Sequence, residues 1–154
     1  MSQLITRPPE DIDRSVRRAV YQHFVLTGEA PTAASVASGL GETITDVTNA
    51  MRRLADAHVL VLKPDSNDIW MAMPFSAVPT AFRVRAAKAA WWANCAWDAL
   101  GIAAALQSDV EIESTCAQDG NPLRLSVTAG TLYGDGLVHF AVPAAHWWDD
   151  IDFT

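Results

Sequence analysis

A cysteine and an aspartate three residues apart, Cys95 and Asp98, are the side chains of this sequence best suited to chemistry. On a helix this spacing places both on one face, with their Cβ atoms about 5–6 Å apart, so that a thiol and a carboxyl can act on one ligand. Three tryptophans, Trp91, Trp92 and Trp97, lie around the pair. A carboxyl that is partly desolvated by aromatic rings has a raised pKa and can store a proton. The structural alternative is a small buried thiol and a solvated carboxylate on an ordinary helix.

The elements that must position this pair lie in the C-terminal half. Residues 83–106 are rich in alanine and tryptophan and contain no proline, which predicts one long helix carrying the pair. Apolar runs bounded by turn residues predict strands at 110–115, 123–128 and 137–142, with a loop at 130–136. A small antiparallel sheet packed with a long helix makes this half an α+β unit.

The N-terminal half has the order of a winged helix-turn-helix. Apolar residues at helical spacing, with glycine and threonine at the ends, predict helices at about 13–27, 31–40 and 43–58. Two short apolar runs, 59–63 and 69–73, flank a turn and predict a hairpin. Three helices followed by a hairpin are typical of a winged helix-turn-helix.

A boundary is predicted between these halves. Two prolines and several small residues between positions 74 and 80 indicate a linker. We therefore expect a winged-helix-like N-terminal domain over 1–75 and an α+β domain over 76–154 that carries Cys95 and Asp98.

Composition and charge narrow the class of protein. Half of the 154 residues are apolar, which is enough for a buried core. The net charge of −7 argues against nucleic acid as the main partner, because affinity for phosphate backbones comes from excess lysine and arginine. Two cysteines are too few for a disulfide framework and are expected as free thiols. No apolar run is long enough to span a membrane, and we expect a soluble, cytoplasmic protein.

Two ordered motifs resemble the alkylmercury lyase (organomercurial lyase) family. The first is Cys-Ala-Trp-Asp-Ala-Leu at 95–100, and the second is Thr-Cys-Ala-Gln-Asp-Gly-Asn-Pro-Leu at 115–123, after a predicted strand. The resemblance places Cys95 on the family's catalytic cysteine and Asp98 on its catalytic aspartate. It places Cys116 on a turn cysteine that is structural in the family. The family also has a winged-helix-like N-terminal domain.

The reaction that the resemblance implies is protonolysis of a carbon–mercury bond. A thiolate is a soft ligand for mercury, so Cys95 would capture the organomercurial, which is the substrate, while Asp98 would deliver a proton to the departing carbon. No cofactor is needed. The expected partners are a small organomercurial and low-molecular-weight thiols.

The sequence departs from the family at the second thiol that shares the metal. The stretch 146–154 resembles the approach to that thiol but contains no cysteine. We expect the second thiol either at or beyond Thr154 in a longer protein or to be missing, with Cys116 as a less suitable substitute on a turn.

Two other functions fit parts of the sequence. A thiol-based binder or sensor would capture mercurials or other soft electrophiles through Cys95 without cleaving them. A DNA-binding regulator would use the helix at 43–58, with Arg52 and Arg53, as its recognition helix. The acidic charge and the presence of only two lysines argue against the second alternative.

Overall fold

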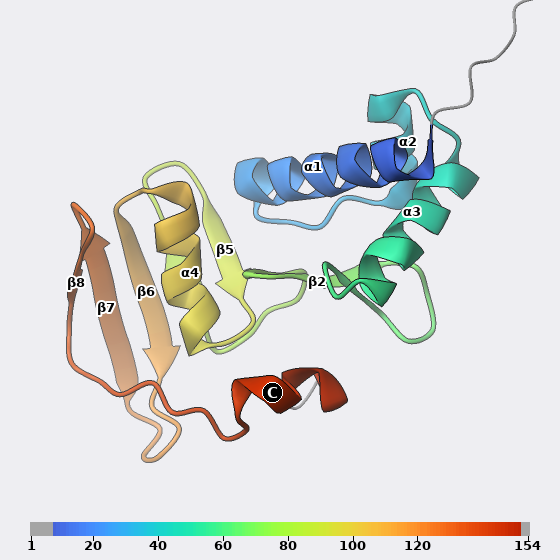
Figure 1. Ribbon diagram of the computed structural model, residues 1–154. Coiled ribbons are helices and arrows are strands. Elements are labelled where there is room, and N and C mark those ends of the chain that lie inside the picture. The colour runs from blue at the N-terminus through green and yellow to red at the C-terminus, as the bar shows by residue number, and fades with distance from the viewer. Residues whose placement is uncertain (1–7, 152–154) are drawn as a thin grey trace, which may run out of the picture.

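The computed structural model describes residues 8–151, so residues 1–7 and 152–154 are not discussed structurally. Its helices and antiparallel sheet confirm the predicted α+β class (Figure 1). The expectation of a second thiol at or beyond Thr154 falls outside the described residues. Within residues 8–151, no helix is both long enough and apolar enough to cross a membrane.

Helix α1 (Pro9–Thr27) runs along the N-terminal part of the core. Val16, Val20 and Phe24 recur every fourth residue and are fully buried on one face of the helix. The helix begins before the predicted residue 13, because a proline at the first position and acidic residues in the first turn suit a helix N-terminus. It ends at Gly28, whose φ of 76° closes the last turn.

Helices α2 (Ala33–Leu40) and α3 (Ile44–Asp56) confirm the other two helices predicted from the sequence. Each begins at a threonine. The hydroxyl of Thr32 accepts the backbone N–H of Ser35 at 3.1 Å, and that of Thr43 accepts the N–H three residues on at the same distance. These caps satisfy N–H groups that have no partner inside the helix.

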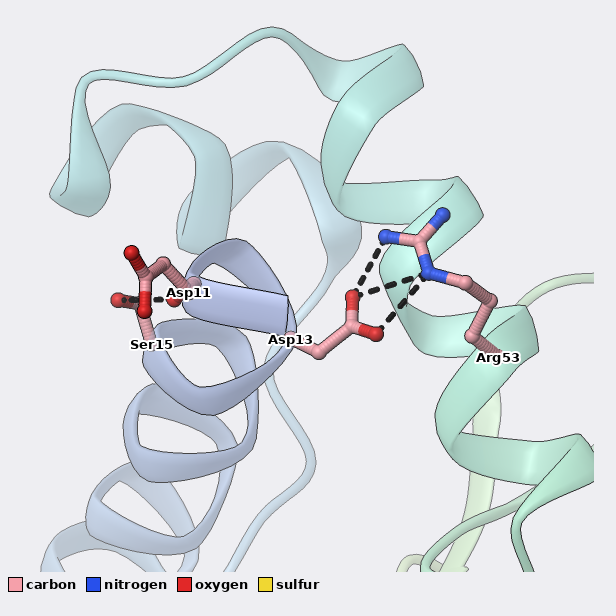
Figure 2. Close-up of polar contacts among 4 residues, drawn as sticks. All are labelled: Asp11, Asp13, Ser15 and Arg53. Atoms are coloured by element: carbon pink, nitrogen blue, oxygen red, sulfur yellow. Dashed lines mark hydrogen bonds and ion pairs between the residues drawn. The ribbon is translucent and has the colours of Figure 1, made fainter. Parts of the chain in front are cut away.

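An ion pair joins α1 to α3 at their exposed side. The Arg53 Nε atom donates to the Asp13 carboxylate at 3.0 Å, and the guanidinium contacts the same carboxylate through a second nitrogen (Figure 2). Within α1, the Ser15 hydroxyl donates to the Asp11 carbonyl at 2.9 Å. The neighbouring Arg52 donates to the Asn67 side chain in the hairpin turn at 3.0 Å.

One antiparallel sheet runs through the molecule in the strand order β1-β2-β3-β5-β4-β6-β7-β8. Its strands are β1 (Val61–Leu62), β2 (Ile69–Ala72), β3 (Phe75–Ser76), β4 (Arg83–Arg85), β5 (Ala90–Ala93), β6 (Val110–Thr115), β7 (Pro122–Thr128) and β8 (Thr131–Tyr133). The predicted hairpin at 59–73 is confirmed by β1 and β2, and the strands predicted at 110–115 and 123–128 by β6 and β7.

The segment predicted as a linker, 74–80, contains a strand of the sheet. Phe75 and Ser76 are buried, and β3 pairs with β2 on one side and β5 on the other. The Phe75 ring stacks on Phe24 with centroids 5.5 Å apart, so it belongs to the core. Proline content suggested a linker, but burial of an aromatic side chain decides the local structure. The division into domains at residue 75 stays a prediction.

The prediction of one long helix over 83–106 is wrong. Two strands, β4 and β5, occupy its first part, and only α4 (Ala96–Leu106) is helical. Val84 and Trp91 pair across β4 and β5 and are both buried, and Ala93, two residues on, is buried as well. This period of two belongs to a strand, so burial against the core outweighs the helix propensity of alanine.

The C-terminal part also differs from the prediction at two places. The expected loop at 130–136 contains β8, which pairs with β7. The expected strand at 137–142 has no regular structure, and the 3-10 helix η1 (Ala144–Asp149) follows it. Figure 1 shows this segment leaving the far edge of the sheet and returning below α4. Leu137 in this segment is exposed, whereas the Phe140 ring contacts Trp97 of α4.

The C-terminal end of α1 docks on β5. The Phe24 carbonyl accepts two hydrogen bonds of 2.8 Å, one from the Gly28 N–H and one from the Trp91 indole. A Cβ atom at Gly28 would lie 2.2 Å from the Ala90 carbonyl oxygen, so only glycine fits here. The helix end and the strand before α4 are thereby fixed together.

Replacing Gly28 with alanine tests this contact. Gly28→Ala is expected to lower the free energy of unfolding by more than the roughly 1–2 kcal/mol that a left-handed backbone costs alanine, because β5 must also move. Gly41→Ala is the matched control, since Gly41 has a similar φ of 69° and nothing within 4 Å of its Cβ position. Urea unfolding measures both, and equal losses would contradict the docking role of Gly28.

Candidate active site

Cys95 lies at the junction between β5 and α4. It is the N-cap residue of the helix, with an extended backbone at φ −148° and ψ −179°, and Asp98 lies in the first helical turn. The prediction that both residues lie within one helix is therefore wrong for Cys95, which precedes the helix, and right for Asp98. An N-cap side chain lies beside the N–H groups of the first turn, the same turn that carries the Asp98 carboxyl.

The Cys95 thiol is partly buried. Burial raises its pKa above the ordinary value of 9.0, and the negative charge of Asp98 acts in the same direction. Backbone N–H groups of Asp98 and Trp97 favour the thiolate, but their effect is smaller than that of burial. The resting side chain at neutral pH is therefore the thiol, whose proton becomes available when a soft metal replaces it.

The Asp98 carboxyl is also partly withdrawn from water. Burial raises its pKa above the ordinary value of 3.8, against the hydrogen bond donated by Asn94 Nδ2 to Asp98 Oδ2 at 2.9 Å. The structure thus supports the sequence-based prediction of a carboxyl with a raised pKa. Asn94, which the sequence analysis did not select, was identifiable only as a polar residue four positions before Asp98.

A cavity of about 340 Å³ contains both side chains. The β5–α4 junction, from Asn94 to Asp98, lines one part of it. The rest of the lining includes Met71 and Met73 of the hairpin and the C-terminal segment 138–142. Most of the lining is apolar, which suits a ligand with an organic group. Neither the two methionines nor the C-terminal segment could be placed at this cavity from the sequence, because neither is close to Cys95 along the chain.

Aromatic contacts connect the C-terminal segment to this cavity. The Phe140 ring meets the Trp97 ring edge-on at 6.0 Å and the Trp147 ring at 5.5 Å. The Trp147 indole donates to the Val142 carbonyl at 2.9 Å, which closes the segment on itself. Trp148 stacks on His58, at the end of the helical part, with ring centroids 4.0 Å apart. The cavity is therefore covered by residues distant in sequence from the pair.

Cys116 and two of the three tryptophans lie elsewhere. Cys116 begins the turn after β6, where its N–H donates to the Asn121 carbonyl at 2.8 Å, and it does not line the cavity. Trp91 is buried in the core. Trp92 lies under the Arg83 guanidinium, 4.3 Å from its ring centroid, in a separate cavity that contains no cysteine. Of the predicted tryptophans, only Trp97 lines the cavity with the pair.

Within residues 8–151, no cluster of three or more histidine, cysteine or acidic side chains is arranged to bind a metal ion. A soft metal bound in the cavity would rely on Cys95 as its only cysteine ligand from the described residues.

Comparison with known proteins gives a consistent result. A family described as alkylmercury lyase matches residues 75–154. A crystal structure of the mercury-bound form of MerB2 is similar to this chain, with a TM-score of 0.63 and 27% sequence identity. The match covers 82% of this chain and 60% of that one, so this chain spans less than two thirds of the solved structure. No curated protein sequence matches.

The raised pKa of Asp98 predicts a pH-dependent effect on stability. A group with a raised folded-state pKa contributes stability below its unfolded-state pKa and loses it as pH rises through the folded-state value. Asp98→Asn removes the buried charge and is expected to raise Tm by a few degrees at mildly alkaline pH, with a smaller difference in acid. Asp119→Asn is the control, because backbone hydrogen bonding from Asn121 lowers the pKa of Asp119. A fall in Tm for Asp98→Asn at alkaline pH would contradict a desolvated carboxylate.

Proposed function

Because the chain belongs to the alkylmercury lyase family, we propose that it cleaves carbon–mercury bonds by protonolysis, with Cys95 as the mercury ligand and Asp98 as the proton donor. The observation that carries this proposal is the shared cavity: a thiol and a carboxyl with a raised pKa line the same largely apolar space. The family gives the class of reaction, and the cavity supports the two residue roles.

Capture is the first step. The Cys95 thiol replaces the group that accompanies the organomercurial in solution, so that a sulfur–mercury bond forms and the thiol proton is released. Mercury is a soft metal that binds thiolate strongly, so capture succeeds even though burial favours the protonated thiol. The Asp98 carboxylate lines the same cavity as Cys95 and can accept the released proton. Capture would therefore load Asp98 with the proton needed next.

Proton delivery is the second step. The electron pair of the carbon–mercury bond takes the Asp98 proton, so that a hydrocarbon leaves and Hg²⁺ stays on the Cys95 sulfur. A carboxyl with a raised pKa suits this step because it keeps its proton until the carbon is in reach. The apolar lining excludes water from the organic group and places the carbon near the acid. Asp98 ends the step as a carboxylate, ready for the next proton.

Release of mercury needs further thiolate ligands. Cys116 does not line the cavity, and Cys95 is the other cysteine of the chain. We therefore propose that low-molecular-weight thiols supply the ligands that remove Hg²⁺ from Cys95. A proton from one of these thiols returns to the Cys95 sulfur as Hg²⁺ leaves it, so that the protein is restored to its starting form.

Two other proposals are kept for specific reasons. A binder or sensor without cleavage is favoured by the presence of one cysteine in the cavity. The helix order α1–α2–α3 followed by the β1–β2 hairpin supports a winged-helix-like unit over residues 1–75. For DNA binding by that unit, however, Arg52 and Arg53 would first have to leave their hydrogen bonds to Asn67 and Asp13.

Benzene release from phenylmercury in the presence of excess thiol tests the proposed activity. The wild-type protein is expected to release benzene catalytically, and Cys95→Ser to release none above buffer. Asp98→Asn is expected to lose on the order of a hundredfold or more in rate while still binding the mercurial, since it lacks the proton donor. Cys116→Ser is the matched cysteine control and should retain activity.

The same experiment separates the alternatives. Binding of phenylmercury that depends on Cys95, with no benzene from the wild-type protein, would reject the lyase and leave the binder. Unchanged release by Asp98→Asn would reject Asp98 as the proton donor.

A further inference from the structure

Asn94 is the residue that the reaction outlined above does not use. It stands between β5 and Cys95, lines the same cavity, and donates from Nδ2 to Asp98 Oδ2 at 2.9 Å. The oxygen of the same side chain, Asn94 Oδ1, makes no such bond within the described residues. Asn94 Oδ1 has less than 1 Å² of accessible surface and no hydrogen-bond partner among residues 8–151. This carboxamide therefore uses only its donor side.

A buried acceptor without a partner is unfavourable, and water does not reach this one. Leucine branches at Cγ as asparagine does and has no polar acceptor to bury, although its side chain is larger. Stability therefore gives no reason for an amide at position 94. The bond from Nδ2 to Asp98 is the contact that distinguishes asparagine from an apolar residue here.

The two oxygens of Asp98 are not equivalent. Oδ2 receives the Asn94 N–H, so a proton on Oδ2 would face another hydrogen. Oδ1 has no hydrogen-bond partner among the described residues and is not fully buried. A ligand in the cavity that Asp98 lines can therefore meet Oδ1.

We propose that Asn94 is a positioning residue that anchors Asp98 Oδ2, so that the proton for carbon–mercury cleavage is carried on Oδ1. This role rests on the proposed function for its purpose, while the anchoring itself is a property of the ligand-free protein. The anchor also limits the effect of burial, because a donated hydrogen bond favours the carboxylate and burial favours the acid. Asp98 can then both receive the proton of Cys95 and give it up.

Several titrating groups surround Asp98 and must be separated from it in any test. Cys95 interacts with it from the same junction, Tyr21 from α1, and His139 lines the cavity from the C-terminal segment. Carbon-13 NMR of the Asp98 carboxyl follows this group alone, without substrate and without turnover. The reading is therefore independent of lyase activity.

The test compares Asn94→Leu with the wild-type protein by this titration. The midpoint of the Asp98 titration is expected to rise in Asn94→Leu, because the hydrogen bond donated to Asp98 Oδ2 is gone. Asn121→Leu is the matched control: Asn121 donates to Asp119 at the same 2.9 Å on the exposed turn, and its loss should leave the Asp98 midpoint unchanged. Asn94→Ala lacks the donor as well and decides the question if the leucine variant does not fold.

An unchanged Asp98 midpoint in the folded Asn94 variant would overturn the proposal. In the cleavage assay, the variant is expected to show kcat lowered on the order of tenfold to a hundredfold with KM nearly unchanged, because the acid is misplaced but the cavity remains. If the wild-type protein cleaves nothing, the proposed function fails, and the NMR titration still decides whether Asn94 anchors Asp98.

Discussion

The Phe24 carbonyl, at the end of α1, accepts both the Gly28 N–H and the Trp91 indole at 2.8 Å. Through this carbonyl the helical part is fixed to β5, and β5 ends one residue before Asn94. Trp91 and Ala93 are buried in the core, and the chain leaves the sheet directly after Ala93. The turn into α4 then brings Asn94, Cys95 and the first-turn carboxyl to one cavity. The position of the candidate site is thus a consequence of core packing.

Burial has a second consequence, which is chemical. It raises the pKa of the thiol and of the carboxyl, so both are biased toward their protonated forms. A thiol beside a carboxylate places one charge in the apolar cavity, whereas a thiolate beside a carboxylate would place two charges there that repel and require solvation. In the proposed reaction, exchange of the thiol proton for mercury would keep the charge in the cavity low and leave a proton close to the carbon. The hydrogen bond from Asn94 lowers the pKa of the Asp98 carboxyl against the effect of burial. It acts on the carboxyl and not on the Cys95 thiol.

Local patterns in the sequence predicted the parts of this arrangement that depend on neighbouring residues. Threonine caps and the apolar face of α1 are such features, and the motif around Cys95 and Asp98 pointed to the family. The long helix over 83–106 was predicted wrongly because alanine favours a helix locally, while the pairing of Val84 with Trp91 is a contact between strands. The C-terminal cover, with Phe140 against Trp97, depends on contacts between distant segments that no local pattern contains.

The proposed mechanism requires one thiol and one carboxyl in a common cavity to complete capture and cleavage on the same molecule. Intact-protein mass spectrometry after mixing with one equivalent of phenylmercury, with no added thiol, tests it most directly. The expected product is a protein that carries mercury without the phenyl group on Cys95, together with one equivalent of benzene, monodeuterated when the solvent is D₂O. A stable adduct that retains the phenyl group on Cys95 would contradict it.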